Sequence, residues 1–233
     1  MTTVAIMQPY FLPYIGYFQL MAAADKFVVF DDVNFINRGW INRNRLLLNG
    51  SAYTFTVPLR HASQNRLICD IELDDEQNWR AKLLNTIRQA YGKAPYYAQV
   101  SILLENLINY PATKLDAFLL NSLCEIARYL SIEVEIINSS RIYNNATLKG
   151  QERILDICRQ EAADIYINPI GGVNLYDRDS FLSKDISLKF VNSHPIDYPQ
   201  GKNEFIPWLS IMDVLMFNDK AAIGRFINKI DLI

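Results

Sequence analysis

The first 30 residues alternate between short apolar runs and polar interruptions. The apolar run Val4–Met7 stops at Gln8-Pro9, a pattern typical of a buried strand that leads into a loop. Apolar residues at helical spacing follow in Leu12–Ala24, and Asp25-Lys26 separates them from the β-rich run Phe27–Phe30. Strand, loop, helix and strand in this order predict a β-α-β unit, the building block of parallel sheets with right-handed crossovers.

The residues that follow show a different pattern, with short apolar runs and one strong turn signal. Asn49-Gly50 between two such runs favours a hairpin. Antiparallel strands are expected at Leu46–Leu48, Tyr53–Val57 and Leu67–Leu73. Two amphipathic helices are predicted after them, at Glu76–Tyr91 and Ala112–Leu130.

Strands and helices alternate again from Val134 onward. Strands are expected at Val134–Ile137, Asp164–Ile167 and Leu188–Val191, and helices at Gly150–Ala162 and Ile206–Phe217. The pattern predicts an α/β fold in one domain over residues 1–233, with a mostly parallel, Rossmann-like sheet and a helical C-terminal part. Residues from about 45 to 130 would form an antiparallel and helical insertion in this domain.

Composition and charge narrow the class of protein. The 233 residues are 50% hydrophobic and 21% charged, which is enough apolar material for a sizeable core. A net charge of -2 and a pI near 5.7 argue against phosphate neutralisation, so DNA is not an expected partner. Three widely spaced cysteines among apolar neighbours indicate buried thiols in a reducing compartment. Without a signal peptide or a transmembrane run, we expect a cytoplasmic protein.

The turn after the first predicted strand holds the densest group of candidate binding residues. These residues are Gln8, Tyr10, Tyr14, Gly16 and Tyr17. In open α/β sheets ligands commonly bind at this turn, and the free N–H groups of a helix start suit a phosphate or carboxylate. The glutamine suits an amide or base edge, and the tyrosines suit stacking or hydrogen bonding. In the alternative interpretation the two prolines shape a turn and the aromatic residues fill the core.

A second polar cluster follows the second predicted strand. Its members are Asp31, Asp32, Arg38, Trp40, Asn42 and Arg43. Because the ends of neighbouring parallel strands meet, this cluster should share a site with the first turn. Adjacent strand residues point to opposite faces, so only one aspartate should face that site. The arginines suit a diphosphate or carboxylate, with the tryptophan as a ring platform. The alternative is a solvated charged loop.

The chain resembles the WbqC-like protein family through these two clusters. The N-terminal match runs from Met7 to Asn44 and includes Gly16-Tyr17-Phe18, Asp31-Asp32-Val33 and Arg38-Gly39-Trp40-Ile41-Asn42-Arg43-Asn44. Later segments extend the match over nearly the whole chain: Trp79, Lys93-Ala94-Pro95-Tyr96, Ser139-Ser140, Gly171-Gly172, and Phe205 with Leu209-Ser210-Ile211. The resemblance implies a role in bacterial O-antigen or polysaccharide assembly, on a nucleotide-linked or lipid-linked sugar.

A second similarity concerns Tyr14-Ile15-Gly16-Tyr17. Nucleotidyltransferase-like folds carry a His-x-Gly-His turn at the same strand-to-helix junction. The similarity implies a nucleotidyltransferase-like sheet, with ATP or a nucleotide sugar over the helix start. Tyrosine stands at both histidine positions here and cannot supply imidazolium charge, which weighs against adenylyl transfer. The cofactor stays open, with ATP and Mg²⁺ as one option, and no metal site is predicted.

Two further loops carry both a functional and a structural interpretation. Gly171 and Gly172 follow a predicted strand, so a ligand-facing loop with Tyr176 and Asp177 competes with an ordinary turn. His61 lies in a polar loop and is a candidate general base, although a surface role is favoured.

The C-terminal half adds two weaker candidates. Lys149 and Arg153 lie one helical turn apart and are interpreted as a solvated helix face rather than an anion site. Phe205, Trp208 and Leu209 are expected to pack a terminal helix, with a homodimer contact as the alternative.

The leading hypothesis is a transferase that adds a small acyl or aminoacyl group, such as glycyl, to a nucleotide-linked amino sugar. The first turn and the arginines would hold the phosphorylated substrate, and Asp31, Asp32 or His61 would take the proton. One alternative is a non-catalytic sugar-nucleotide-binding scaffold. Another is an Mg²⁺-dependent nucleotidyltransferase with the metal on the aspartates.

Overall fold

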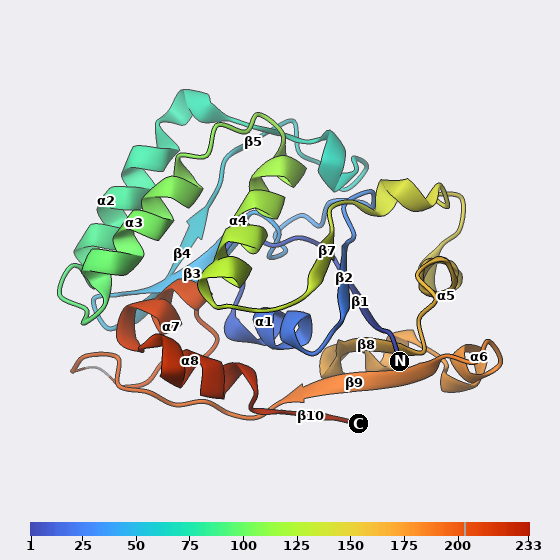
Figure 1. Cartoon of the computed structure of the whole chain (residues 1–233). Helices are drawn as coiled ribbons and strands as arrows, with labels where there is room; N and C mark the ends of the chain where they lie inside the picture. Colours follow the sequence, from blue (N-terminus) through green and yellow to red (C-terminus); the bar gives the residue numbers. More distant parts are fainter. Residues whose placement is uncertain (203) are drawn as a thin grey trace.

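A mostly parallel sheet forms the centre of the protein (Figure 1), as a computed structural model describes it for residues 1–202 and 204–233. The strands of this sheet are β1 (Thr3–Met7), β2 (Lys26–Val29), β7 (Glu135–Ile137), β8 (Ile165–Pro169), β9 (Ser187–Ser193) and β10 (Ile230–Leu232). Their order is β10-β9-β8-β1-β2-β7, and every neighbouring pair is parallel except β9 with β10. The parallel strands have the order of a doubly wound fold, with the reversal of strand order between β1 and β8. The predicted mostly parallel Rossmann-like sheet is confirmed.

Both faces of the sheet are buried, and alternate residues of one strand enter different layers. Val4 and Ile6 of β1 belong to a hydrophobic cluster that α5 (Gly150–Gln160) and α6 (Arg178–Leu182) cover. Ala5, between them, belongs to a larger cluster on the other face. This alternation follows from the two-residue period of a strand, and burial on both faces is what a parallel sheet requires.

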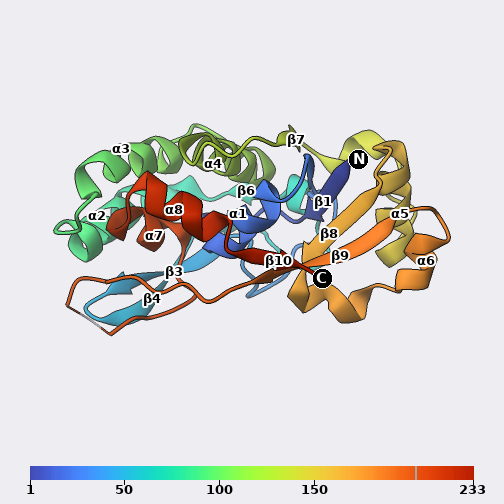
Figure 2. The ribbon, with the colours of Figure 1, turned by 60° about the horizontal axis from the view of Figure 1, so that its bottom comes forward.

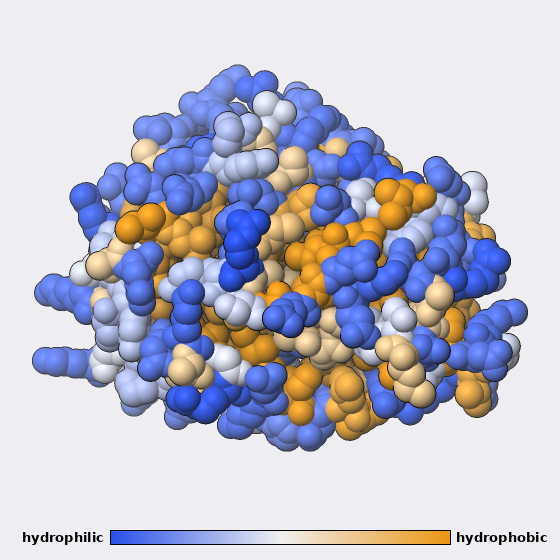
Figure 3. Space-filling model, viewed as in Figure 1, coloured by the Kyte–Doolittle hydropathy of each residue, from blue (hydrophilic) through white to orange (hydrophobic). Residues whose placement is uncertain are grey.

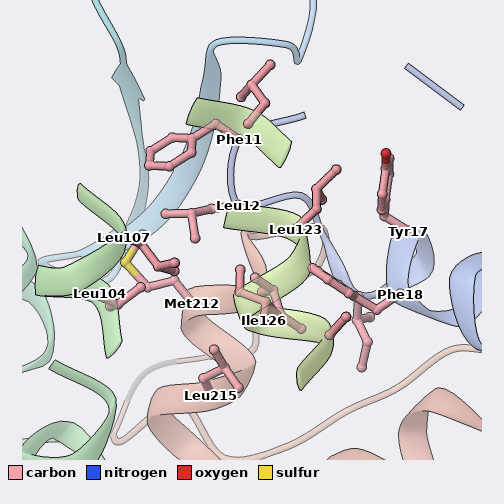
Figure 4. Packing of buried hydrophobic residues seen from close by; sticks show 14 of the residues in the cluster. Phe11, Leu12, Tyr17, Phe18, Leu104, Leu107, Leu123, Ile126, Met212 and Leu215 are labelled. Carbon is pink, nitrogen blue, oxygen red and sulfur yellow. The ribbon is translucent and has the colours of Figure 1, made fainter. Parts of the chain in front are cut away.

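The larger cluster joins the sheet to helices from distant parts of the chain. These helices are α1 (Ile15–Ala22), α2 (Trp79–Tyr91), α3 (Tyr97–Ile108), α4 (Leu115–Tyr129), α7 (Ile211–Phe217) and α8 (Lys220–Ile227). In Figure 4, Phe11 and Leu12 of the first turn lie among side chains of α3, α4 and α7. The turn after β1 is therefore anchored in the hydrophobic core rather than placed on the surface.

A hairpin follows β2, as the Asn-Gly signal predicts. Its strands are β3 (Arg43–Leu48) and β4 (Ser51–Thr56). Asn49 and Gly50 both have positive φ, 51° and 74°, which a two-residue hairpin turn requires and which these residue types tolerate. Figure 2 shows the segment between β9 and α7 running beside this hairpin. A second small pair, β5 (Leu59–Arg60) with β6 (Glu72–Leu73), is also antiparallel.

Two predicted elements differ from the structure. The expected strand Leu67–Leu73 is a strand only at its last two residues. Before them, the N–H groups of Ile68 and Cys69 donate to carbonyl oxygens of the loop after β2, and Ile68–Asp70 forms a short 3₁₀ helix. The expected helix Ile206–Phe217 begins only at Ile211, because Pro207 lacks an N–H and Trp208 has φ 62°. 

The sequence pattern did not predict α3, α6, α8 and β10. β10 has three residues at the sheet edge, and its pairing with β9 is a tertiary contact that no local pattern reveals. Other short 3₁₀ helices occur at Asp75–Gln77, Ser140–Tyr143 and Ile170–Leu175.

The surface is mixed in character. On the face in Figure 3, apolar residues emerge between hydrophilic ones across the region of α4 and β7. Within the described residues, no helix is both long and apolar enough to cross a bilayer. The cysteines are free thiols, of which Cys69 and Cys158 are buried and Cys124 is half-buried. Burial raises the pKa of Cys69 to about 11, which leaves it a poor nucleophile at neutral pH.

Candidate functional site

The turn between β1 and α1 has a strained backbone that two distant segments hold in place. Leu12 is fully buried and has φ 46°, a left-handed conformation that costs energy for a residue with a Cβ. Its carbonyl oxygen accepts hydrogen bonds from Asn44 Nδ2 at 2.7 Å and from Ser210 Oγ at 2.8 Å. The turn, the start of β3 and the segment before α7 therefore form one structural unit.

Backbone hydrogen bonds add to this connection. The N–H of Phe11 donates to the carbonyl of Ile41 at 2.9 Å, and the N–H of Ile211 donates to the carbonyl of Pro13 at 2.8 Å. The N–H of Ser210 donates to the carbonyl of Arg45, also at 2.9 Å. The structure thus brings the proline-tyrosine turn together with the tryptophan-arginine segment, as the topology of neighbouring strand ends predicts.

The start of α1 is shaped by Tyr14 and Gly16. No side chain of the described residues caps this helix, and its first turn contains no acidic residue. The Tyr14 ring lies so close to Gly16 that an added Cβ would meet it at 2.3 Å. Glycine is required here because it lets the tyrosine fold over the helix start, where unpaired N–H groups and the helix dipole favour an anion.

A small cavity of about 170 Å³ lies beside the residues that precede this helix. It is lined by Tyr10, Pro13, Tyr14, Trp40, Asn44, Arg45 and Trp208. Burial raises the pKa of both Tyr10 and Tyr14, so their hydroxyls stay protonated at neutral pH and act as donors. Tyr17 does not line this cavity. It is buried, and its hydroxyl donates to the carbonyl of Gln8 at 2.9 Å.

Two arginines flank the tryptophan of this cavity. The guanidinium carbons of Arg43 and Arg45 each lie 5.5 Å from the Trp40 ring centroid, within cation-π distance. In residues 1–202 and 204–233, neither arginine forms an ion pair with a carboxylate. Arg45 donates from Nη2 to the carbonyl of Trp208 at 3.1 Å, while its Nε is buried without a partner in the described chain. The cavity therefore has a positive charge without a neutralising side chain.

A larger cavity of about 600 Å³ adjoins the small one. Tyr14 and Trp208 line both cavities, and their ring centroids are 5.7 Å apart. The larger cavity continues along α1 to Gln19 and is closed by residues of the segment after β9, among them His194, Tyr198 and Phe205. It lies beside the first half of α1 and begins at Ser193, the last residue of β9.

The two aspartates after β2 point elsewhere. Asp31 accepts hydrogen bonds from Ser139 Oγ at 2.7 Å and from the Ser140 N–H at 3.1 Å, and Arg141 lies 3.3 Å away. Burial raises the pKa of Asp31, although the Ser139 hydrogen bond and Arg141 oppose this shift. Its carboxylate therefore belongs to a network with the segment after β7 and lines neither cavity.

Asp32 is held by Arg153 of α5. Arg153 Nη2 lies 2.6 Å from both carboxylate oxygens, and Ser140 Oγ donates to one of them. The interpretation of Arg153 as part of a solvated helix face is wrong, because this residue is 4% exposed and its guanidinium lies 4.8 Å from the Phe30 ring centroid. Lys149 is exposed, as that interpretation requires. A paired, buried arginine at this position ties α5 to the end of β2.

The sequence matches the model of the WbqC-like protein family over residues 8–224. The chain belongs to this family. A Mycobacterium tuberculosis protein named Rv1507c is 29% identical over 225 residues, which cover 94% of each chain, and its name assigns it no function. No solved structure gave a significant match. Family membership confirms the resemblance and suggests a protein of a polysaccharide cluster.

Other predicted site residues of this WbqC-like protein surround a separate hollow. Arg38, Asn42 and Arg43 line a shallow depression of about 300 Å³ together with Ala62, the neighbour of His61. The Asn42 side chain donates to the carbonyl of Val57 at 2.8 Å, which fixes β3 against the segment after β4. His61 is exposed and has φ 50°. The structure thus places Arg43 between the small cavity and this hollow.

The glycine pair after β8 lies in the 3₁₀ helix Ile170–Leu175. Gly172 is buried, and an added Cβ would meet Asn168 Oδ1 at 2.2 Å, whereas Gly171 is exposed with open space around it. The Tyr176 hydroxyl lies 3.1 Å from that of Tyr166, and Asp177 caps α6. These contacts give Gly172, Tyr176 and Asp177 a structural role in the packing after β8.

Arg45 and Trp208 line the small cavity but were not among the predicted site residues. Arg43 and Arg45 are two residues apart on β3, so strand periodicity places both on one face, and this signal was available. Phe205, Trp208 and Leu209 were expected to pack a terminal helix, yet they precede α7 and line the larger cavity. Trp208 is 64% exposed, and no sequence pattern predicts its contact with Tyr14. The described residues contain no group of three histidine, cysteine or acidic side chains that could hold a metal ion.

Proposed function

We propose that this protein is a transferase of O-antigen or polysaccharide biosynthesis that acts on a nucleotide-linked amino sugar. The group transferred would be a small acyl or aminoacyl group, with glycyl as the leading candidate. The observation that carries the proposal is the small cavity in which Arg45, Trp40 and the tyrosines of the first turn line one space. Family membership, with its link to polysaccharide clusters, supports the same setting.

The charge of this cavity favours a phosphorylated substrate. Arg45 has no carboxylate partner among the described residues, and its planar guanidinium matches the oxygens of a phosphate or diphosphate. The hydroxyls of Tyr10 and Tyr14, which also line the cavity, add hydrogen-bond donors. A neutral sugar without phosphate would leave the arginine unpaired, which disfavours it as the ligand.

The proposed chemistry is amide formation. The amine nitrogen of the sugar attacks the carbonyl carbon of the acyl donor, a C–N bond forms, and the bond to the donor's leaving group breaks. The nitrogen loses one proton, which a general base must accept. ATP with Mg²⁺ would be needed only if the acyl donor has to be activated beforehand.

Asp31 is preferred among the proposed proton acceptors, and because it lines neither cavity it would act on an amine that reaches the end of β2. Burial raises the pKa of Asp31, which favours proton uptake, whereas Asp32 is held in a buried ion pair with Arg153. Both follow β2 directly, and the N–H of Phe30 donates to the carbonyl of Met7 at 2.9 Å, so the end of β2 adjoins the first turn. His61 lies farther along the chain on an exposed loop and is the second choice.

One observation favours a second candidate function. The carboxylates of Asp31 and Asp32 are paired with serine and arginine side chains and line neither cavity. A non-catalytic protein that binds a nucleotide sugar and scaffolds other enzymes would need the cavities and the structural network, but no base. The same pairing disfavours an Mg²⁺-dependent nucleotidyltransferase, because the aspartates already have donors.

The decisive experiment combines binding and mass measurement. The protein is incubated with UDP- and dTDP-linked amino sugars and with activated glycine. The mass of the sugar nucleotide is then measured by mass spectrometry. A gain of one glycyl group supports the transferase. Binding without a mass change indicates the scaffold, and pyrophosphate release from ATP indicates the nucleotidyltransferase.

Variants assign the roles of the residues. Arg45→Gln is expected to weaken nucleotide-sugar binding by about tenfold or more. Arg88→Gln is the matched control, because Arg88 is an exposed arginine of α2 that contacts Asn85 of the same helix. Asp31→Asn is expected to abolish turnover while binding persists. If no nucleotide sugar raises the unfolding temperature of the wild-type protein, the proposed function is wrong.

A further inference from the structure

We infer that the larger cavity binds the nucleobase of the substrate, with the phosphates passing Tyr14 and Trp208 to reach Arg45. This inference rests on the proposed function and adds the class of group that selects the substrate. Its starting point is that Tyr14 and Trp208 line both cavities. One molecule with a ring system at one end and an anionic group at the other can therefore occupy both.

The walls of the larger cavity suit a flat ring. Tyr14, Tyr198, Phe205 and Trp208 all contribute to them. The rings of Tyr198 and Phe205 pack edge to face at 5.1 Å, so this part of the wall is already ordered. Aromatic side chains stack on nucleobases with little dependence on the base. These walls would therefore bind the base, and the choice between bases would need a polar group. The volume of about 600 Å³ lies in the usual range for small-molecule sites.

Gln19 supplies the polar group that can discriminate. It lines the cavity and is 1% exposed, and its Nε2 donates to the carbonyl of Phe226 at 2.7 Å. Its Oε1 is buried and has no hydrogen-bond partner in the described chain. Because Nε2 is committed to Phe226, the free end of the amide is an acceptor. It would pair with an N–H at the edge of a base, such as N3–H of uracil or the amino group of adenine.

A prenyl-linked phosphate also combines an apolar part with an anion, so the two ligands must be distinguished. A hydrocarbon chain offers no donor to Gln19 and no partner to Ser193 or Asp197, which also line the cavity. Covering the buried Gln19 Oε1 with hydrocarbon would leave it without a hydrogen bond, at a cost in binding. The cavity lining therefore favours a nucleobase.

The test uses nucleosides, which have no phosphate, so that the small cavity with Arg45 does not contribute to binding. Binding of uridine and adenosine is measured by calorimetry and compared with 3-methyluridine and N6,N6-dimethyladenosine, which lack the N–H donor. At least one parent nucleoside is expected to bind about tenfold more tightly than its methylated partner, since a missing hydrogen bond to a buried group costs about that factor. This comparison needs no variant protein.

Variants locate the effect. Gln19→Met keeps the length of the side chain and removes both the acceptor and the donor to Phe226, so it is expected to abolish the difference between a nucleoside and its methylated partner, and a melting curve checks that the variant is folded. Gln160→Met on the exposed end of α5 is the control and should leave the difference unchanged. If the protein binds nucleotides but binds methylated and unmethylated bases equally tightly, the inference is overturned and the proposed function stays intact. Tighter binding of farnesyl phosphate than of any nucleotide would overturn both.

Discussion

The carbonyl oxygen of Leu12 accepts a hydrogen bond from the Asn44 side chain at 2.7 Å, which joins the first turn to the start of β3. Residues 32 positions apart are thus in direct contact at the entrance of the candidate site. Because Leu12 has φ 46°, the contact also compensates for a strained backbone. This buried amide and the Ser210 hydroxyl, which donates to the same carbonyl, together fix the geometry of the turn.

Asn44→Ala is the direct test of this contact. The variant removes a buried donor, so the free energy of unfolding should fall by about 1–3 kcal/mol. Urea denaturation measures the change. Asn228→Ala serves as control and should cost less than about 0.5 kcal/mol, because the exposed Asn228 side chain donates to the carbonyl of Gly224 within its own turn. Equal effects in the two variants would show that the turn does not need Asn44.

Gly16→Ala should separate stability from binding. An added Cβ would meet the Tyr14 ring at 2.3 Å, so the ring must leave the helix start and both cavities change shape. Alanine favours a helix over glycine by about 1 kcal/mol. This gain offsets the cost of displacing the ring, so the free energy of unfolding should change little. Nucleotide binding, measured by calorimetry, should fall by about tenfold or more, as expected for a lost stacking or hydrogen-bond contact.

Gly224→Ala is the matched control for this variant. It lies in α8 and has open space around the position of a Cβ. We expect a gain in stability of about 0.5–1 kcal/mol and unchanged binding. If Gly16→Ala also binds normally, the position of the Tyr14 ring does not matter for the ligand.

Arg153→Met should destabilise the protein strongly. The variant leaves the buried Asp32 carboxylate without its cation, and breaking a buried pair in this way costs about 3–5 kcal/mol. Lys149→Met changes an exposed lysine one helical turn away and should have almost no effect. The melting temperatures of the two variants, compared with that of the wild-type protein, measure the loss of stability. A small effect of Arg153→Met would mean that Ser140 alone satisfies the carboxylate.

Asp213 should make the protein less stable as the pH rises. This buried carboxyl accepts hydrogen bonds from the hydroxyls of Tyr91 at 2.9 Å and Tyr198 at 2.7 Å and from Gln200 Nε2 at 2.7 Å, and no cation pairs with it in the described chain. Burial raises its pKa in the folded state, although these hydrogen bonds oppose the shift. The folded state therefore holds the proton more tightly than the unfolded state, whose aspartate pKa is about 3.9.

The sign of this effect follows from proton linkage. The contribution of Asp213 is fully present below about pH 3.9 and is lost as the pH rises through the folded pKa. Asp213→Asn should flatten this part of the curve, because asparagine does not titrate. Urea denaturation at a series of pH values compares the two slopes. Identical slopes in both proteins would assign the pH dependence to other groups.

The local pattern was enough for the elements that depend on near neighbours in the chain. β1, α1 and β2 follow from apolar periodicity, and the β3–β4 hairpin follows from Asn49-Gly50 because few other residue pairs accept two positive φ angles. The parallel sheet follows from the same unit, since β-α-β crossovers have one hand. The first turn could be recognised as a candidate site for the same reason.

The tertiary structure decided which residues face one another at the site. Trp208 lies on the wall beside Tyr14 because Ser210 bonds to Leu12 and to Arg45, contacts that span up to 198 positions in sequence. The hydrogen-bond partners of Asp31 and Asp32 are likewise distant in sequence. They are Ser139, Ser140 and Arg153, more than 100 positions along the chain. A chain's local pattern sets which faces are apolar, whereas the choice of partner across a packed core depends on the shape of the whole fold.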